Sequence, residues 1–156
     1  MTGHVRAPCR ARCSRAGARA PGRTLARCAR LGASQMVREP PTLSAIIGEF
    51  ALTFGPPEVR RKQLQHLLEL SQRSKVQVLV VPRSAGLHSG LQGAFVLATL
   101  PASRRAGYVD DQLQGRVVTD GGDLDQLEVS WEIVSGLALP VQPSRDLLQR
   151  AITDHD

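Results

Sequence analysis

Long hydrophobic runs are missing from this sequence of 156 residues. The best candidate, Val78 to Val81, is far shorter than the ~20 apolar residues that a helix needs to cross a bilayer. The N-terminal region also lacks the apolar core of a secretory signal peptide. Because cysteine is absent after residue 40, the rest of the chain has no disulfide framework. We therefore expect a soluble, cytoplasmic protein that does not bind membranes.

Cysteine occurs only at Cys9, Cys13 and Cys28. Together with His4, these residues supply four potential zinc ligands. Their spacing matches none of the paired knuckles that hold structural zinc, so reducible thiols are the favoured interpretation. We predict no metal site and no cofactor.

Acidic residues are almost missing from the first 40 positions, which hold nine arginines against the single Glu39. This segment therefore carries a charge of +8, whereas the remaining chain carries −2 and the whole protein +6. A segment rich in Arg, Ala, Gly and Pro buries too little apolar surface to offset its chain entropy. We predict a disordered tail over residues 1–40 and a domain over 41–156. A basic tail on an acidic domain indicates nucleic acid much less than a basic domain would, but it allows non-specific nucleic-acid contact, which added salt would weaken steeply.

Apolar periodicity after the tail predicts mixed secondary structure. A helix is predicted over 57–73, because proline is well tolerated in a first helical turn. The segment 43–52 is predicted as a strand that runs into a turn at Gly48–Glu49. Further strands are predicted over 75–81, 94–100, 107–111 and 115–119. Asp123 and Gln126 resemble a capping box before a second helix, and a third helix ends near Ile152. This order predicts an α+β or α/β fold, with a small central sheet of three to four strands, one preceding helix and two C-terminal helices.

A loop rich in glycine and serine follows the predicted strand 75–81 and reads "VPRSAGLHSGLQGAF" over residues 81–95. It misses the G-x-S-x-G elbow of hydrolases, because His88 stands where the serine should be and Ser89 comes one place late. A strand pattern rather than a helix follows, which also disfavours a phosphate loop. Three interpretations stay open. They are a plain connection, a binding loop whose glycines let a ligand approach, and a small hydrolase or transferase using His88 with Ser84 or Ser89.

Several ordered segments resemble one known family. They are "GPPEVRRKQLQHLLELSQRSKVQVLVVPRSAGLHSGLQGAFVL", "GYVDDQLQGRVVTDGGDL", "WEIVSGLALP" and "SRDLL". The resemblance is to the domain of unknown function 5753, the effector domain behind the helix-turn-helix of actinobacterial Xre-family transcriptional regulators. It runs from about Leu43 to Ile152. The family pattern maps onto Gln63, Leu64, Leu67, Val78, Pro82, Ala85, Gly86, His88, Gly93, Phe95, Tyr108, Val109, Asp110, Trp131, Ala138, Leu139 and Ser144.

The chain departs from the family pattern in two respects. The helix-turn-helix and the opening of the effector domain are not found upstream, where the Arg-rich tail stands instead. We therefore expect a truncated form. Arg83 also occupies a position, shortly after Pro82, where the family usually has an aromatic residue.

The resemblance implies a non-enzymatic regulatory domain that binds a small protein partner or a metabolite. Without a recognition helix, we expect no sequence-specific DNA binding by this chain alone. An apolar surface left by the missing opening segment would favour a homodimer. The alternatives are the hydrolase or transferase above and a non-functional gene remnant. The predicted binding residues are Ser84, Gly86, His88, Ser89, Tyr108, Asp110 and Gln112.

Overall fold

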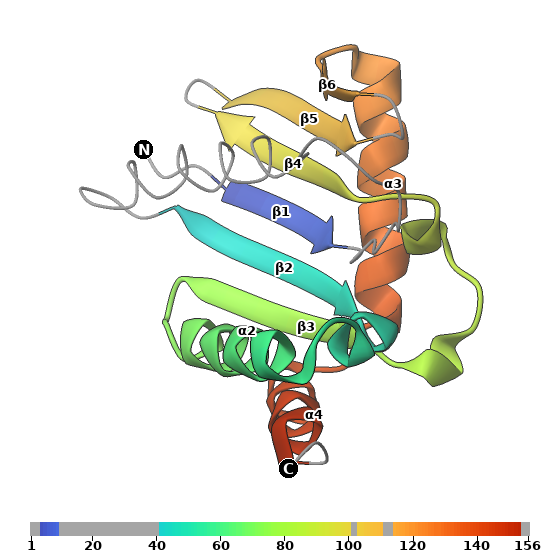
Figure 1. The fold of residues 1–156 in the computed structure, drawn as a ribbon. Helices are drawn as coiled ribbons and strands as arrows, with labels where there is room; N and C mark the ends of the chain where they lie inside the picture. The colour runs from blue at the N-terminus through green and yellow to red at the C-terminus, as the bar shows by residue number, and fades with distance from the viewer. Residues whose placement is uncertain (1–3, 10–40, 101–102, 111–113, 154–156) are drawn as a thin grey trace.

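A computed structural model describes residues 4–9, 41–100, 103–110 and 114–153, with the side chains of 4–9 left aside. Within these ranges six strands form one sheet in the order β3-β2-β1-β4-β5-β6 (Figure 1). The strands are β1 (His4–Cys9), β2 (Thr42–Gly48), β3 (Val76–Val81), β4 (Phe95–Leu100), β5 (Arg104–Asp110) and β6 (Gly115–Val118). The helices are α2 (Pro57–Ser71), α3 (Gly121–Leu137) and α4 (Val141–Thr153), and short 3-10 helices are η1 (Glu49–Thr53), η2 (Arg83–Ala85) and η3 (Ser89–Leu91).

The sheet is mixed. Strands β1, β2 and β3 run parallel to one another, whereas β4, β5 and β6 each run antiparallel to their neighbours. The predicted α+β class, the helix preceding most of the sheet and the two C-terminal helices are confirmed.

The sheet is larger than the three to four strands predicted. β2 is a full member of it, and β1 comes from the Arg-rich segment and pairs with both β2 and β4. Residues 4–9 thus form a strand inside the range predicted to be disordered. The rest of that range lies outside the described residues.

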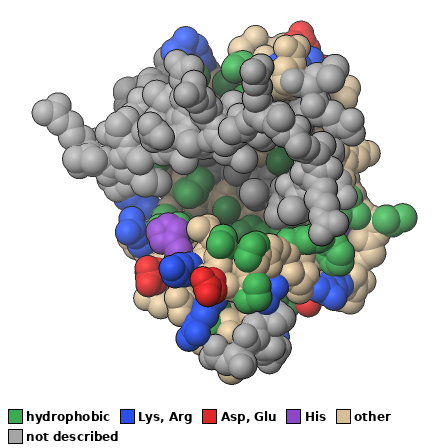
Figure 2. All heavy atoms as spheres, in the orientation of Figure 1, with side chains coloured by type: hydrophobic (Ala, Val, Ile, Leu, Met, Phe, Trp, Pro, Cys, Tyr) green, Lys and Arg blue, Asp and Glu red, His purple; other side chains and the backbone are tan. Residues whose placement is uncertain are grey.

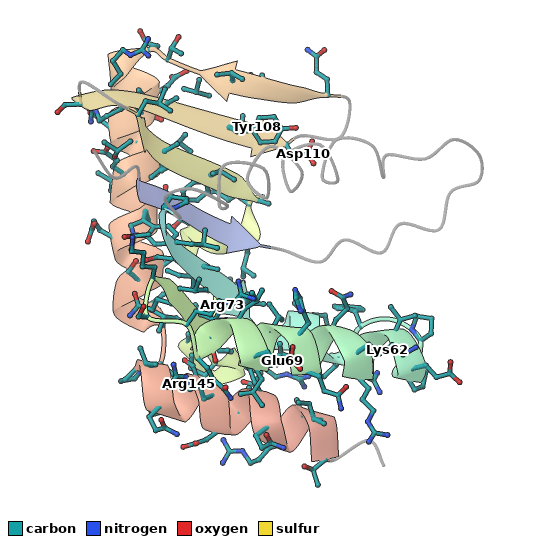
Figure 3. All side chains as sticks on the ribbon, turned by 90° about the vertical axis from the view of Figure 1, so that its left-hand side faces the viewer. Lys62, Glu69, Arg73, Tyr108, Asp110 and Arg145 are labelled. Carbon is teal, nitrogen blue, oxygen red and sulfur yellow. The ribbon has the colours of Figure 1, made fainter. Side chains whose placement is uncertain are left out.

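Each face of the sheet has its own buried cluster. One cluster is formed with α3 and the other with α2 and α4, so the helices lie on opposite faces (Figure 3). Helix α3 contributes Leu124, Trp131 and Val134 and runs across the strands (Figure 1). On the other face, Val78 and Val80 pack with side chains of α2 and α4. Alternating strand residues supply the two clusters, as the pleat requires.

Helix α2 begins at Pro57 as predicted and ends at Ser71, two residues early. The Ser71 hydroxyl donates to the Leu68 carbonyl at 2.7 Å and accepts from Arg145 of α4 at 3.2 Å. The Arg145 side chain also donates to the Ser71 carbonyl, which fixes the last turn of α2 against α4 (Figure 3). The opposite face of α2 carries charged side chains of both signs (Figure 2). No helix within the described ranges is long and apolar enough to cross a membrane.

Helix α3 begins earlier than the capping box predicted. Its N-cap is Asp120, whose carboxylate accepts a hydrogen bond from the Asp123 backbone N–H at 3.1 Å. The predicted capping box at Asp123 and Gln126 was therefore wrong, because it placed the N-cap of the helix three residues too late. Helix propensity does not predict that the helix begins at Gly121 and Gly122, because glycine is a poor helix former.

The outer edge of β3 is closed by the connection between α3 and α4. The Val80 carbonyl accepts from the Leu139 backbone N–H at 2.8 Å, and the Val80 N–H donates to the Ser144 hydroxyl at 3.0 Å. Ser144 in turn donates to the Leu139 carbonyl at 2.9 Å. Val80 and Ser144 are both fully buried. These bonds satisfy an edge strand that would otherwise present unpaired backbone groups.

Replacing Ser144 by alanine leaves the buried Val80 N–H without a partner, so we expect the free energy of unfolding to fall by about 1–3 kcal/mol. Chemical denaturation monitored by Trp131 fluorescence measures the change. Gln142→Ala on the same helix removes only an exposed hydrogen bond to Asp146 and should cost less than about 0.5 kcal/mol. Equal effects of the two variants would contradict the assigned role of Ser144.

Candidate functional site

The loop between β3 and β4 leaves the sheet at the carboxyl ends of the parallel strands, where open α/β sheets usually bind ligands. It contains η2 and η3, with Pro82 at the N-cap of η2 and His88 at the N-cap of η3. Gly86 separates the two short helices with φ +69° and ψ −145°, a conformation that is essentially confined to glycine. The first glycine of the predicted binding loop therefore has a conformational role.

Arg83 anchors the start of this loop to η1. Its backbone N–H donates to a Glu49 carboxylate oxygen at 2.7 Å. Its guanidinium lies 5.3 Å from the centroid of the Phe50 ring, a cation–π geometry. Arg83 thus packs as a cation on an aromatic ring of a neighbouring segment.

The second half of the loop packs against α3. A Cβ atom added to Gly90 would lie 3.0 Å from both His88 Nδ1 and Val134 Cγ2, so glycine allows this close approach. His88 Nδ1 and Ser89 Oγ are both buried and have no hydrogen-bond partner among the described residues. The imidazole and the hydroxyl are therefore not joined as the base and nucleophile of a hydrolase would be.

A pocket of about 400 Å³ opens between this loop, the ends of β5 and β6, and α3. Its lining residues are Ser89, Gln92, Gly93, Ala94, Phe95, Val109, Asp110, Arg116, Leu127 and Ser130. Phe95, Val109 and Leu127 provide apolar surface, and the serines, Gln92 and Arg116 provide polar groups. Apolar and polar surface contribute about equally to this lining, so it suits a ligand that has both an apolar part and a polar group.

The structure brings together only part of the predicted site. Ser89 and Asp110 border the pocket, although the carboxylate of Asp110 lies on the side of β5 away from α3. Ser84, Gly86 and His88 belong to the loop but not to the lining. Gln112 lies outside the described residues.

Tyr108 lies on the side of β5 that faces away from α3, where Figure 3 also shows the carboxylate of Asp110. The side chain of Arg105, three residues earlier on the same strand, instead contacts α3. The Tyr108 hydroxyl lies so close to Gly115 of β6 that a Cβ atom there would be 1.8 Å away. Tyr108 therefore packs along β6 on the face opposite the pocket.

Three polar lining residues were missed from the sequence, namely Gln92, Arg116 and Ser130. Arg116 pairs in register with Val109, and Val118 two residues later is buried toward α3. The two-residue alternation in the predicted strand 115–119 could have placed Arg116 and Val118 on one face. Only the strand register could have shown that this face adjoins the loop.

The side chain of Arg116 forms no ion pair with any carboxylate in the described part of the chain. An exposed guanidinium beside an apolar floor suits a ligand with a negatively charged group, because guanidinium forms paired hydrogen bonds with carboxylates and phosphates. The described residues contain no cluster of three or more His, Cys, Asp or Glu suited to a metal ion. Cys13 and Cys28 lie outside those residues.

Comparison with known proteins gave one finding. A family model described as "Domain of unknown function (DUF5753)" matches residues 1–150. This confirms the resemblance and extends it from Leu43 back through the Arg-rich segment. No curated protein and no solved structure was found to match the chain.

Two glycine-to-alanine changes should have opposite effects on stability. Gly86→Ala forces a side chain into a glycine-only conformation and should lower the free energy of unfolding by about 1–3 kcal/mol. Gly136→Ala, in the last turn of α3 with no atom within 4 Å of the added Cβ, should raise it by about 0.5–1 kcal/mol. Thermal unfolding of both variants measures the difference, and a stabilising Gly86→Ala would refute the loop conformation.

Proposed function

Because the chain belongs to the family "Domain of unknown function (DUF5753)", we propose that it is a non-enzymatic regulatory domain that binds a small ligand in the pocket beside Arg116. The ligand is a small organic anion, with its charged group at Arg116 and its apolar part on Phe95, Val109 and Leu127. In this proposal the domain acts in the cytoplasm of an actinobacterium. In this proposal the ligand modulates operator binding by a helix-turn-helix DNA reader that works with the domain.

The observation that carries this proposal is the unpaired guanidinium of Arg116 in the lining of the pocket. Two further features support it. The volume of about 400 Å³ falls in the range of small-molecule sites. The buried Ser89 Oγ, which has no partner among the described residues, belongs to the same wall, and such unsatisfied groups call for a specific explanation in native structures.

The two buried clusters, one on each face of the sheet, support a folded domain over the alternative of a gene remnant. A non-enzymatic role is supported by the separation of the potential catalytic groups. Ser84 is exposed on η2, and no hydrogen bond links His88 to Ser84 or Ser89 among the described residues.

A comparison of benzoate with benzamide tests the ligand class, because the two molecules share an apolar ring and differ in charge. We expect benzoate to bind in the pocket and benzamide to bind at least about tenfold more weakly, since hydrogen bonds to charged groups contribute about 1.5–3 kcal/mol. Titration followed by amide chemical shifts measures both affinities and locates the site.

Arg116→Gln should abolish the preference for benzoate, whereas Arg104→Gln should leave it intact. Arg104 is the matched control because it is an exposed arginine on the adjacent strand, outside the pocket lining. Equal affinities of benzoate and benzamide, or equal losses in the two variants, would overturn the proposed ligand class.

The competing enzyme hypothesis makes a different prediction for His88. We expect the protein to hydrolyse p-nitrophenyl acetate no faster than His88→Ala, because the imidazole activates no serine in the structure. Circular dichroism verifies that the variant stays folded. Turnover that disappears with His88 while the fold is retained would favour the hydrolase.

A further inference from the structure

A second concave surface lies on the other flank of α3. This groove has a volume of about 580 Å³ and is lined by β4, β5 and α3. Its α3 residues are Asp125, Glu128, Val129, Glu132 and Ile133, and its strand residues are Leu97, Ala98, Thr99, Arg105 and Ala106. Ser130 of the ligand pocket and Glu128 of the groove belong to the same helix, which separates the two concavities.

The groove combines exposed apolar surface with negative charge. Val129 and Ile133, one turn apart on α3, are 60% and 50% exposed, so two neighbouring aliphatic side chains face solvent beside the concavity. Three carboxylates and one guanidinium line the groove, so the formal charges of its lining side chains sum to −2.

The guanidinium of Arg105 already forms hydrogen bonds with two other residues of the groove. It donates to Asp125 at 3.0 Å and to Glu128 at 2.9 Å. Hydrogen bonds to Asp125 and then Glu128 raise the pKa of Arg105 above its ordinary value. Because it is paired with these two acids, it offers little attraction to an incoming anion.

We propose that this groove binds an amphipathic helix of a partner protein, which places apolar side chains against Val129 and Ile133 and Lys or Arg side chains toward the acidic edge. A helix suits the surface because the groove lies on the face of the sheet, where no strand edge offers backbone hydrogen bonds. An extended segment would leave its own backbone groups unpaired there, whereas a helix satisfies them internally.

The layer architecture also favours a helix. Among the described elements, α3 is the only helix in the cluster on this face, whereas α2 and α4 share the opposite face. The acidic and apolar residues extend from Asp125 to Ile133, a rise of about 12 Å at 1.5 Å per residue. A partner helix of about three turns beside α3 would cover them and extend the helical layer.

A second copy of the chain fits the groove poorly. Pairing two copies through the same groove would bring the acidic edges together with like charges. Pairing the groove with another surface of a second copy would be heterologous and would favour open chains of molecules over closed dimers. Charge complementarity therefore points to a different protein with a basic amphipathic helix.

The test uses a synthetic peptide of about four helical turns, with leucines spaced i, i+3, i+4 and i+7 and lysines on both flanks. A second peptide carries glutamates in place of the lysines. We expect the lysine peptide to shift the amide resonances of α3 and β4 and the glutamate peptide to bind at least about tenfold more weakly. Absent binding, or equal binding of both peptides, overturns the proposal.

Two matched pairs of variants locate the contact. Ile133→Ser should weaken the lysine peptide about tenfold, whereas Val117→Ser, which alters a 68% exposed valine outside the groove, should not. Glu132→Lys should also weaken binding, whereas Glu69→Lys on the exposed face of α2 should not. Equal effects within either pair overturn the assignment. Self-association that disappears in Ile133→Ser, measured by sedimentation, would assign the groove to a second copy instead.

Discussion

The hydrogen bonds of Val80 determine how the C-terminal third of the molecule is attached. Both backbone groups of this fully buried residue point away from β2 and are satisfied by Leu139 and Ser144 at the α3–α4 connection. Because that connection is fixed to the edge of the sheet, α3 and α4 are directed to opposite faces. Both buried clusters depend on this arrangement, since each needs one of the two helices.

Helix α3 is consequently the element that defines the functional surfaces. Its buried stripe rests on the sheet, one flank borders the pocket with Arg116, and the other flank borders the acidic groove. A single rigid helix between two concavities gives the proposed ligand site and the proposed partner site a common wall. Coupling between such sites requires only that ligand and partner favour different positions of that wall.

The loop after β3 is held at both ends by packing and hydrogen bonds, but it also contains buried polar atoms without hydrogen-bond partners among the described residues. Arg83 attaches its start to Glu49 and Phe50, and Gly90 allows close packing of its end against Val134. Between these anchors, His88 Nδ1 and Ser89 Oγ are buried without partners among the described residues. Burial of unpaired polar atoms costs free energy. The polar atoms in this part of the loop are therefore less well hydrogen-bonded than those around Ser144.

The sequence by itself determined the local elements and the family. Apolar periodicity predicted α2, the two C-terminal helices and the strands from β3 to β6, because each helix buries one stripe and the strands are short apolar or partly alternating segments. The signal for β1 was weaker. Val5, Ala7 and Cys9 do alternate with His4, Arg6 and Pro8, but a proline argues against a central strand.

The tertiary structure alone decided which predicted residues share a site. Ser89 and Asp110 meet at the pocket because strand order and register bring the β3–β4 loop beside the end of β5. Tyr108 and the carboxylate of Asp110 lie on the other face of β5, because alternation along the strand turns Val109, the residue between them, toward α3. Arg116 joins the pocket because β6 pairs with β5 in one particular register. Pairing between strands this far apart in the chain depends on the packing of the whole sheet, so a local sequence pattern does not predict it.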